Sequence, residues 1–276
     1  MSRRRRAGVG TRAALALLLF TASACRSGAL GDVALGRELA TEIRRVQPLV
    51  RDPVVQAYLL DVARPLLEAA GPQPFSYRLF VLDDPTNNAV ALPGGYVFVH
   101  RGALLSAGSS AEVAAVLAHE IGHVVRRHAI WARDQAWVQQ YRHRATQSRL
   151  ALHGLAVDPR VAELHRIVSS ALFLSQFSQE QEMEADRFAV ETLHAAGGCG
   201  LALVQVFETM AGQQIEAVPA LFASHPPYAL RISAIREKVA RAGPCEVAAA
   251  ASDDPLLGIQ ARLRAPPSLV EPPLRP

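Results

Sequence analysis

Residues 109–128 read Ser-Ser-Ala-Glu-Val-Ala-Ala-Val-Leu-Ala-His-Glu-Ile-Gly-His-Val-Val-Arg-Arg-His, and the His-Glu-x-x-His pattern within them predicts a metal site. On a helix, His119 and His123 lie one turn apart on the same side, so both imidazoles can reach one metal ion. Glu120 is displaced from His119 by roughly 100° about the helix axis, which lets its carboxylate act as a general base on a metal-bound water. At this composition chance produces the pattern in roughly one chain in sixty, so two ordinary histidines are the alternative.

The residues around this pattern predict a helix with one packed side. Ser109 and Glu112 have the spacing of a capping box, which places the start of the helix. The side away from the histidines is apolar and comprises Val113, Leu117, Ile121, Val124 and Val125.

A second helix over residues 179–190 offers carboxylates for a third ligand. Its helical phase predicts an inward arc of Glu182, Ala185, Asp186, Ala189 and Leu193, and an outward charged arc of Glu180, Glu184, Arg187 and Glu191. An inward Glu182 suits a metal ligand, and an inward Asp186 suits a carboxylate that holds the far N–H of a ligand histidine. An ordinary acidic surface helix is the alternative, and it explains only the outward arc.

The two motifs, His119-Glu-Ile-Gly-His123 and Glu182-Met-Glu-Ala-Asp186, together resemble the zinc metallopeptidases that include the CAAX prenyl protease, HtpX, BepA and LoiP. The resemblance implies that Glu182 is the third zinc ligand and that Asp186 orients His119. It also implies a helix-dominated, zincin-like α+β fold with a small edge sheet or hairpin beside the active-site helix, one Zn²⁺ per chain, and peptide-bond hydrolysis.

Upstream of the histidines, residues 32–70 predict two helices and residues 75–82 a strand. Residues 87–104 predict a hairpin that turns at Pro93-Gly94-Gly95, and the proline predicts an edge of the sheet. The family has the same Asn-Ala-x-x-x-Pro-Gly-Gly string, which implies that an extended peptide binds along this edge. The implied substrate-binding residues are Asn88, Ala89, Gly94 and Gly95, and the alternative is a hairpin with no binding role.

Downstream, Ser224-His225-Pro226-Pro227 resembles the family's His-Pro signature before its last helix. The resemblance implies that His225 is a catalytic-site residue, either a regulatory zinc ligand or a transition-state donor, and a helix-capping histidine is the alternative. Residues 129–176 predict two or three helices that cover the cleft. Four further histidines lack a paired acid at ligand spacing and are interpreted as non-ligands: His128, His143, His153 and His165.

The chain begins with a predicted signal peptide over residues 1–24, basic at its start and apolar from Ala13 to Phe20. Ala22-Ser23-Ala24-Cys25 resembles a lipoprotein cleavage box, which predicts a lipid anchor on Cys25 and a linker over residues 25–31. Cleavage after Ala24 without lipid is the alternative. Because Arg26 follows the cysteine, we expect delivery to the outer membrane of a Gram-negative bacterium, facing the periplasm.

Removal of residues 1–24 would leave 24 basic and 25 acidic residues, so the net charge of +4 belongs to the signal peptide. The balanced remainder gives no support to nucleic-acid binding, and no later apolar run is long enough to span a membrane. We expect one metallopeptidase domain over residues 32–247 and a disordered tail rich in Pro and Ala over residues 248–276. Cys199 and Cys245 predict a disulfide in an oxidising compartment, with free thiols as the alternative.

These observations predict a zinc-dependent endopeptidase of the bacterial cell envelope that cleaves misfolded or unassembled envelope proteins. An outer-membrane assembly factor that holds unfolded chains with little turnover is the alternative from another class. A hydrolase of non-peptide substrates is a third possibility that the zinc ligands alone leave open.

Overall fold

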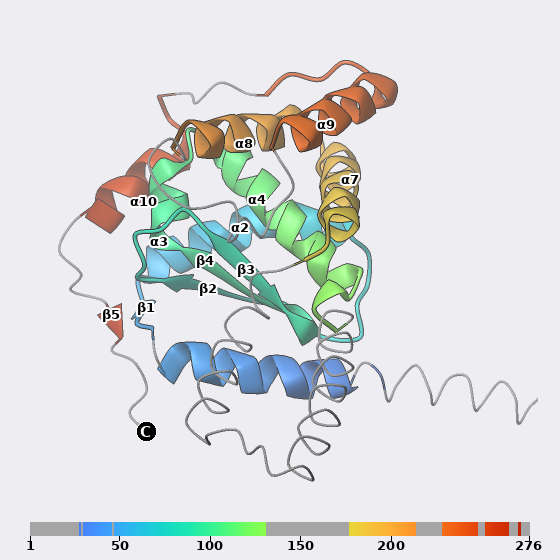
Figure 1. The fold of residues 1–276 in the computed structure, drawn as a ribbon. Helices are drawn as coiled ribbons and strands as arrows, with labels where there is room; N and C mark the ends of the chain where they lie inside the picture. The colour runs from blue at the N-terminus through green and yellow to red at the C-terminus, as the bar shows by residue number, and fades with distance from the viewer. Residues whose placement is uncertain are drawn as a thin grey trace, which may run out of the picture.

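The computed structural model describes residues 28, 30–45, 47–130, 177–213, 228–247, 252–264 and 270–271 (Figure 1). Its helices are one over residues 30–45, α2 (Pro53–Ala69), α3 (Arg101–Ser106), α4 (Ser110–Val125), α7 (Gln179–Ala195), α8 (Leu201–Gln213), α9 (Tyr228–Ala242) and α10 (Pro255–Arg264). Its strands are β1 (Leu49–Val50), β2 (Arg78–Leu82), β3 (Ala89–Leu92), β4 (Tyr96–His100) and β5 (Val270–Glu271), with a 3-10 turn η1 (Pro93–Gly95). The predicted helix-dominated α+β fold is confirmed.

The strands form one sheet in the order β3-β4-β2-β1-β5. The tight turn η1 makes β3 and β4 antiparallel neighbours, with Ala89 opposite Val99. The strand predicted over residues 75–82 is shorter, and it pairs in parallel with β4, Arg78 lying opposite Tyr96. The predicted small sheet is confirmed, and β3 is an edge strand among the described strands, as Pro93 indicated.

Side chains alternate between the two faces of this sheet, and each face packs into a separate hydrophobic core. One face packs under α2, α4, α7 and α8 through Leu79, Val81, Ala91, Val97 and Val99. The other face packs on the helix over residues 30–45 through Leu82, Leu92, Tyr96 and Phe98. Figure 1 shows this helix, in blue, on the opposite side of the sheet from α2 and α4. Because both faces are covered, β4 is buried along its whole length.

The helix over residues 30–45 approaches the hairpin turn so closely that glycine is needed on both sides. A Cβ atom at Gly36 would lie 1.8 Å from the carbonyl oxygen of Pro93, and one at Gly94 would lie 2.6 Å from the Cα of Val33. Asp32 adds a bidentate ion pair with Arg127 at the end of α4, both distances being 2.8 Å. The helix is therefore fixed to the hairpin and to α4 at once.

The predicted disordered tail over residues 248–276 is wrong for the part that forms α10. Leu256, Ile259 and Leu263 recur at helical spacing and are buried in the main core. Gln260 Nε2 donates hydrogen bonds to the carbonyl oxygens of Leu104 and Ala107, at 3.0 and 2.8 Å. The prediction of disorder rested on the Pro- and Ala-rich composition of the whole tail and overlooked this short amphipathic segment. Its three apolar residues pack it against the main core.

The sulfur atoms of Cys199 and Cys245 are bonded, with their Cα atoms 5.5 Å apart. The bond joins the start of α8 to the segment that follows α9. No described helix is long and apolar enough to cross a membrane. The predicted signal peptide, the lipid anchor at Cys25, the cover over the cleft within residues 131–176, and His225 all lie outside the described residues.

Candidate metal centre

Helix α4 carries the His-Glu-x-x-His pattern and begins where the sequence predicted. The Ser109 hydroxyl accepts the backbone N–H of Glu112. A capping box would require the Glu112 carboxylate to accept the backbone N–H of Ser109. It accepts the backbone N–H of Gly108 instead, so the box is not complete. The predicted apolar side is buried except at Val125, and the histidine side is buried as well. This second burial results from α7, which packs across α4 in the most extensive contact between any two described elements.

Helix α7 begins with a capping box between Ser178 and Gln181 and turns the expected acids inward. Glu182 is fully buried and Asp186 nearly so, whereas Glu180, Arg187 and Glu191 are exposed. Glu184 is intermediate, with 40% of its side chain exposed. This burial agrees with the predicted inward arc. Because a charged side chain is almost never fully buried without a partner or metal, Glu182 and Asp186 need such partners.

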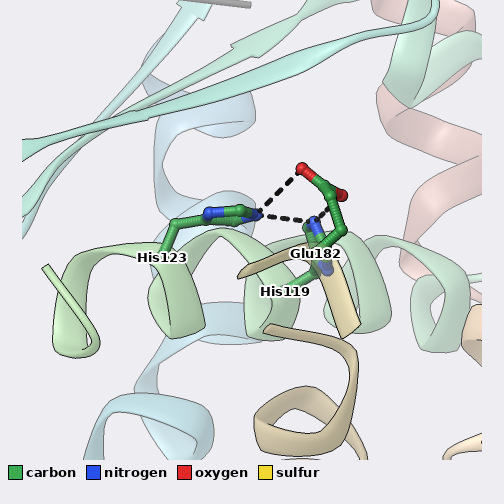
Figure 2. Close-up of side chains that lie close together, drawn as sticks. All are labelled: His119, His123 and Glu182. Atoms are coloured by element: carbon green, nitrogen blue, oxygen red, sulfur yellow. Dashed lines mark hydrogen bonds and ion pairs between the residues drawn. The ribbon is translucent and has the colours of Figure 1, made fainter. Parts of the chain in front are cut away.

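Three ligand atoms converge between these helices (Figure 2). The Nε2 atoms of His119 and His123 lie 3.0 Å apart. Glu182 places Oε2 3.5 Å from Nε2 of His119 and Oε1 3.7 Å from Nε2 of His123. A tetrahedral zinc ion with Zn–N bonds of about 2.0–2.1 Å would hold its ligand atoms about 3.3 Å apart. The observed spacing and the two-imidazole, one-carboxylate donor set both fit a single zinc ion.

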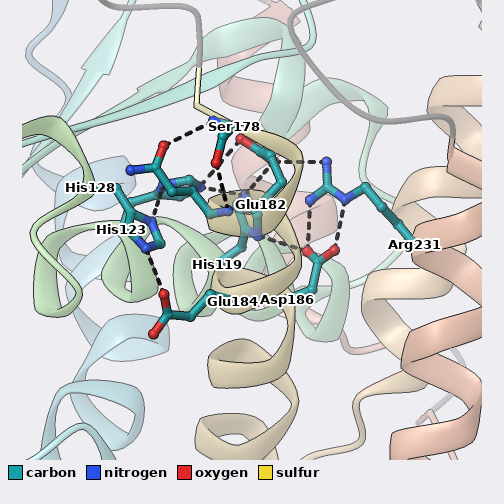
Figure 3. A network of polar contacts seen from close by, with 9 residues as sticks. His119, His123, His128, Ser178, Glu182, Glu184, Asp186 and Arg231 are labelled. Atoms are coloured by element: carbon teal, nitrogen blue, oxygen red, sulfur yellow. Dashed lines mark hydrogen bonds and ion pairs between the residues drawn. The ribbon is translucent and has the colours of Figure 1, made fainter. Parts of the chain in front are cut away.

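The far nitrogen of His119 meets Asp186, as the family resemblance implied. His119 Nδ1 lies 3.0 Å from Asp186 Oδ1, and both side chains are buried (Figure 3). A carboxylate at this place orients the imidazole and leaves Nε2 available to a metal.

Arg231, on α9, is a part of the site to which the sequence assigned no role. Its guanidinium donates two 2.7 Å hydrogen bonds to Asp186, lies 2.9 Å from Glu182 Oε2, and stacks over the ring of Phe207 at 4.1 Å. Burial raises the pKa of Asp186, but hydrogen bonds from Arg231 and His119 outweigh it and hold that pKa below its ordinary value. In the sequence, Arg231 is an arginine within a helical segment, and no local pattern pairs it with Asp186.

His128 lies on the other side of the pair of histidines. Its Nδ1 is 3.0 Å from Nδ1 of His123, and its Nε2 is 3.3 Å from a carboxylate oxygen of Glu184. The sequence has no acid at ligand spacing from His128, and the acid that reaches it, Glu184, comes from α7. His128 is outside the converging ligand group, in agreement with its interpretation as a non-ligand.

The two histidines of the candidate site have opposite protonation tendencies. Burial lowers the pKa of His119, but its hydrogen bonds to Asp186 and Glu182 outweigh burial and raise that pKa to about 9. Burial and the nearby His119 charge lower the pKa of His123 well below its ordinary value. A metal ion here would compete with the proton on His119, so binding would release a proton.

Of the predicted substrate-binding residues, Asn88 and Ala89 lie at the edge of the sheet and Gly94 and Gly95 do not. The two glycines are buried, and a side chain on Gly95 would meet the ring of Phe75 at 2.8 Å. Their small size serves contacts within the chain, and Gly94 also lines a small cavity with His123, so the contact of the two glycines with substrate stays a prediction. Ala91 of β3 lines a small cavity together with His123, so β3 lies beside the ligand group.

Comparison with known proteins gives independent information on the chain. The model of "Peptidase family M48" matches residues 50–239. A putative beta-barrel assembly-enhancing protease of Vibrio cholerae is 32% identical over 213 residues, which cover 75% of this chain and 43% of that protein. Two Escherichia coli proteins, metalloprotease YcaL and metalloprotease LoiP, are each 29% identical, covering 66% and 67% of this chain and 69% and 71% of their own lengths. The chain thus spans less than half of the Vibrio relative.

Proposed function

The chain belongs to peptidase family M48, and on that premise we propose that it is a zinc-dependent endopeptidase. The observation that carries the proposal is the convergence of His119, His123 and Glu182 from two helices onto one point. In this proposal the two imidazoles bind zinc through Nε2 and Glu182 through its carboxylate. Asp186 holds His119 from behind, and Arg231 fixes both carboxylates.

Zinc held by these three side chains would lower the pKa of a water toward ~7 and polarise a peptide carbonyl. Glu120 is the proposed general base. It is buried on α4 next to His119, one residue along the same turn. Glu120 would accept the proton of the attacking water and then deliver it to the leaving amine.

The edge strand β3 is the proposed site for the substrate backbone. The His100 N–H donates to the Asn88 carbonyl oxygen, so Asn88, Val90 and Leu92 face β4 with their hydrogen-bonding groups. By alternation Ala89 and Ala91 direct theirs away from β4, to an edge where no further described strand lies and where Asn88 Oδ1 already accepts the Ala89 N–H. An extended peptide would add here as a strand, with little choice of sequence.

A series of peptide substrates tests this pairing without altering the protein. Single N-methyl groups remove one backbone donor at a time, so KM should rise at alternate residues only. An equal effect at every residue would argue against strand pairing.

We further propose that the substrates are misfolded or unassembled proteins of the bacterial cell envelope. The basic and apolar residues 1–24, the candidate lipidation site at Cys25 and the bonded pair Cys199–Cys245 support export to an oxidising compartment. The name of the Vibrio relative, a putative beta-barrel assembly-enhancing protease, supports a role at the outer membrane. His225 remains a proposed gate or transition-state donor at the zinc.

A factor that holds unfolded chains without cutting them would use the same edge strand. The discriminating experiment measures zinc content and casein cleavage of the purified chain, with Glu182→Ala as the matched variant. The endopeptidase should hold one zinc ion, lose cleavage with a chelator, and lose zinc in the variant. Casein binding without chelator-sensitive cleavage would favour the holding factor.

A further inference from the structure

One buried histidine beside the ligand group has no part in the proposed chemistry. His128 is 3% exposed, follows the last turn of α4, and contacts His123 on one side and Glu184 on the other. We propose that His128 is a positioning residue that holds His123 in the tautomer whose Nε2 is free to bind zinc. This inference rests on the proposed zinc site and deepens it.

The argument begins with the direction of each nitrogen of His123. Nε2 faces His119 and Glu182, whereas Nδ1 lies 3.0 Å from Nδ1 of His128 (Figure 3). A neutral imidazole that binds a metal through Nε2 carries its hydrogen on Nδ1. The group facing that N–H must then accept a hydrogen bond, and Nδ1 of His128 is placed to do so.

Glu184 determines which nitrogen of His128 can accept. Since the Glu184 carboxylate accepts hydrogen bonds only, the His128 Nε2 that lies 3.3 Å away carries the hydrogen. Nδ1 of the same ring is left with its lone pair directed at His123. Arg126, 3.3 Å from the other carboxylate oxygen, holds Glu184 in turn. The chain of contacts therefore specifies one direction of donation, from His123 to His128 to Glu184.

Packing fixes the ring planes in which these bonds form. The rings of His123 and His128 are nearly perpendicular, with centroids 4.9 Å apart. Phe177 stacks on His123 with centroids 4.0 Å apart and 26° between the planes. Asp186 contacts the far nitrogen of His119 directly. Each of the two proposed ligand histidines therefore has its far nitrogen held by a separate partner.

The test compares two substitutions of nearly equal shape. In the full chain, His128→Asn retains an acceptor close to the position of Nδ1, whereas His128→Leu removes it. We expect Leu to weaken zinc binding by about 10–100-fold, as loss of such a partner does in other zinc sites, and Asn to restore most of that loss. Competition with a chelator gives the Kd, and the Co²⁺ absorption spectrum should change with Leu only. His194→Ala, at an exposed position of α7, is the control.

Equal zinc Kd values for the wild type, His128→Leu and His128→Asn would overturn the inference, as would an Asn variant as weak as Leu. If neither His128 variant folds, Glu184→Ala decides. Glu184 is 40% exposed, and its removal should weaken zinc binding several-fold, whereas an unchanged Kd would overturn the proposal. A wild-type chain that binds no zinc would instead contradict the proposed function itself.

Discussion

Arg231 and Asp186 form a bidentate pair in which both hydrogen bonds are 2.7 Å long and neither side chain is more than 4% exposed. The same guanidinium reaches Glu182, so one cation from α9 balances two buried carboxylates of α7. The proposed third zinc ligand is thereby held in place by a residue distant in sequence.

Replacing Arg231 by Ala should destabilise the metal-free protein by about 3–5 kcal/mol, because two carboxylates would remain buried without their cation. Urea denaturation in the presence of a chelator measures this free energy. Arg236→Ala on the same helix is the control, since Arg236 pairs with Glu208 where both are more than half exposed. Its loss should be below about 1 kcal/mol. Similar losses for both variants would show that the buried pair is not the stronger one.

Replacing Glu120 by Gln should leave zinc bound and lower the rate of casein cleavage by about 10²–10⁴-fold, because the amide cannot accept the proton of the attacking water. Zinc analysis and cleavage rates check the two halves of this expectation. Glu208→Gln, at an exposed position of α8, should change neither. A Glu120→Gln variant that cleaves at the wild-type rate would refute its assignment as the base.

Replacing Gly36 by Ala should lower the free energy of unfolding by about 1–3 kcal/mol or more, because the added Cβ would overlap the Pro93 carbonyl. Gly31→Ala in the same helix meets no atom within 4 Å and should stabilise the protein by about 0.5–1 kcal/mol. Thermal denaturation of the two variants gives shifts of opposite sign if the contact is as close as described. Shifts of the same sign would contradict it.

The Asp254 carboxylate should make folding sensitive to acid. Burial raises its pKa, but hydrogen bonds from Ser110 and from the Leu256 N–H outweigh it and lower that pKa below the ordinary value of 3.8. A carboxyl with a lowered pKa stabilises the fold above its unfolded pKa, near 4, and this contribution disappears as the pH falls through the folded pKa. The advantage of wild type over Asp254→Asn in urea should therefore vanish between about pH 5 and pH 2.

Removing the bond between Cys199 and Cys245 should cost about 2–4 kcal/mol of stability, because it closes a loop across α8 and α9. The double Cys→Ala variant and the reduced wild type should have similar urea midpoints, both below that of the oxidised protein. A reductant that leaves the wild-type midpoint unchanged would contradict this.

The sequence predicted the parts of the site that helical geometry controls. His119 and His123 share a helix side by their spacing, and the phase of α7 distinguished the buried Glu182 and Asp186 from the exposed Glu180 and Glu191. Local periodicity was sufficient because each choice concerned residues within a few turns of one helix.

The parts that were missed depend on contacts between distant segments. Arg231 lies 45 residues from Asp186, and Glu184 lies 56 residues from His128, so no local pattern joins them. The parallel pairing of β2 with β4 was missed for a similar reason. β3 occupies one edge of β4, and β2 pairs with the other edge. The close approach of Gly94 to Val33 was also missed, because the helix over residues 30–45 is remote from the hairpin in sequence.

The close fit of the helix over residues 30–45 against the hairpin turn bears on how the protein can be shortened for expression. The family match begins at residue 50, yet a fragment cut there would uncover Tyr96 and Phe98 and leave the Pro93 turn without its neighbour. The same applies beyond residue 239, where α10 would be lost. The smallest recombinant fragment that keeps the hairpin beside the metal site must therefore start before Asp32 and extend past Arg264.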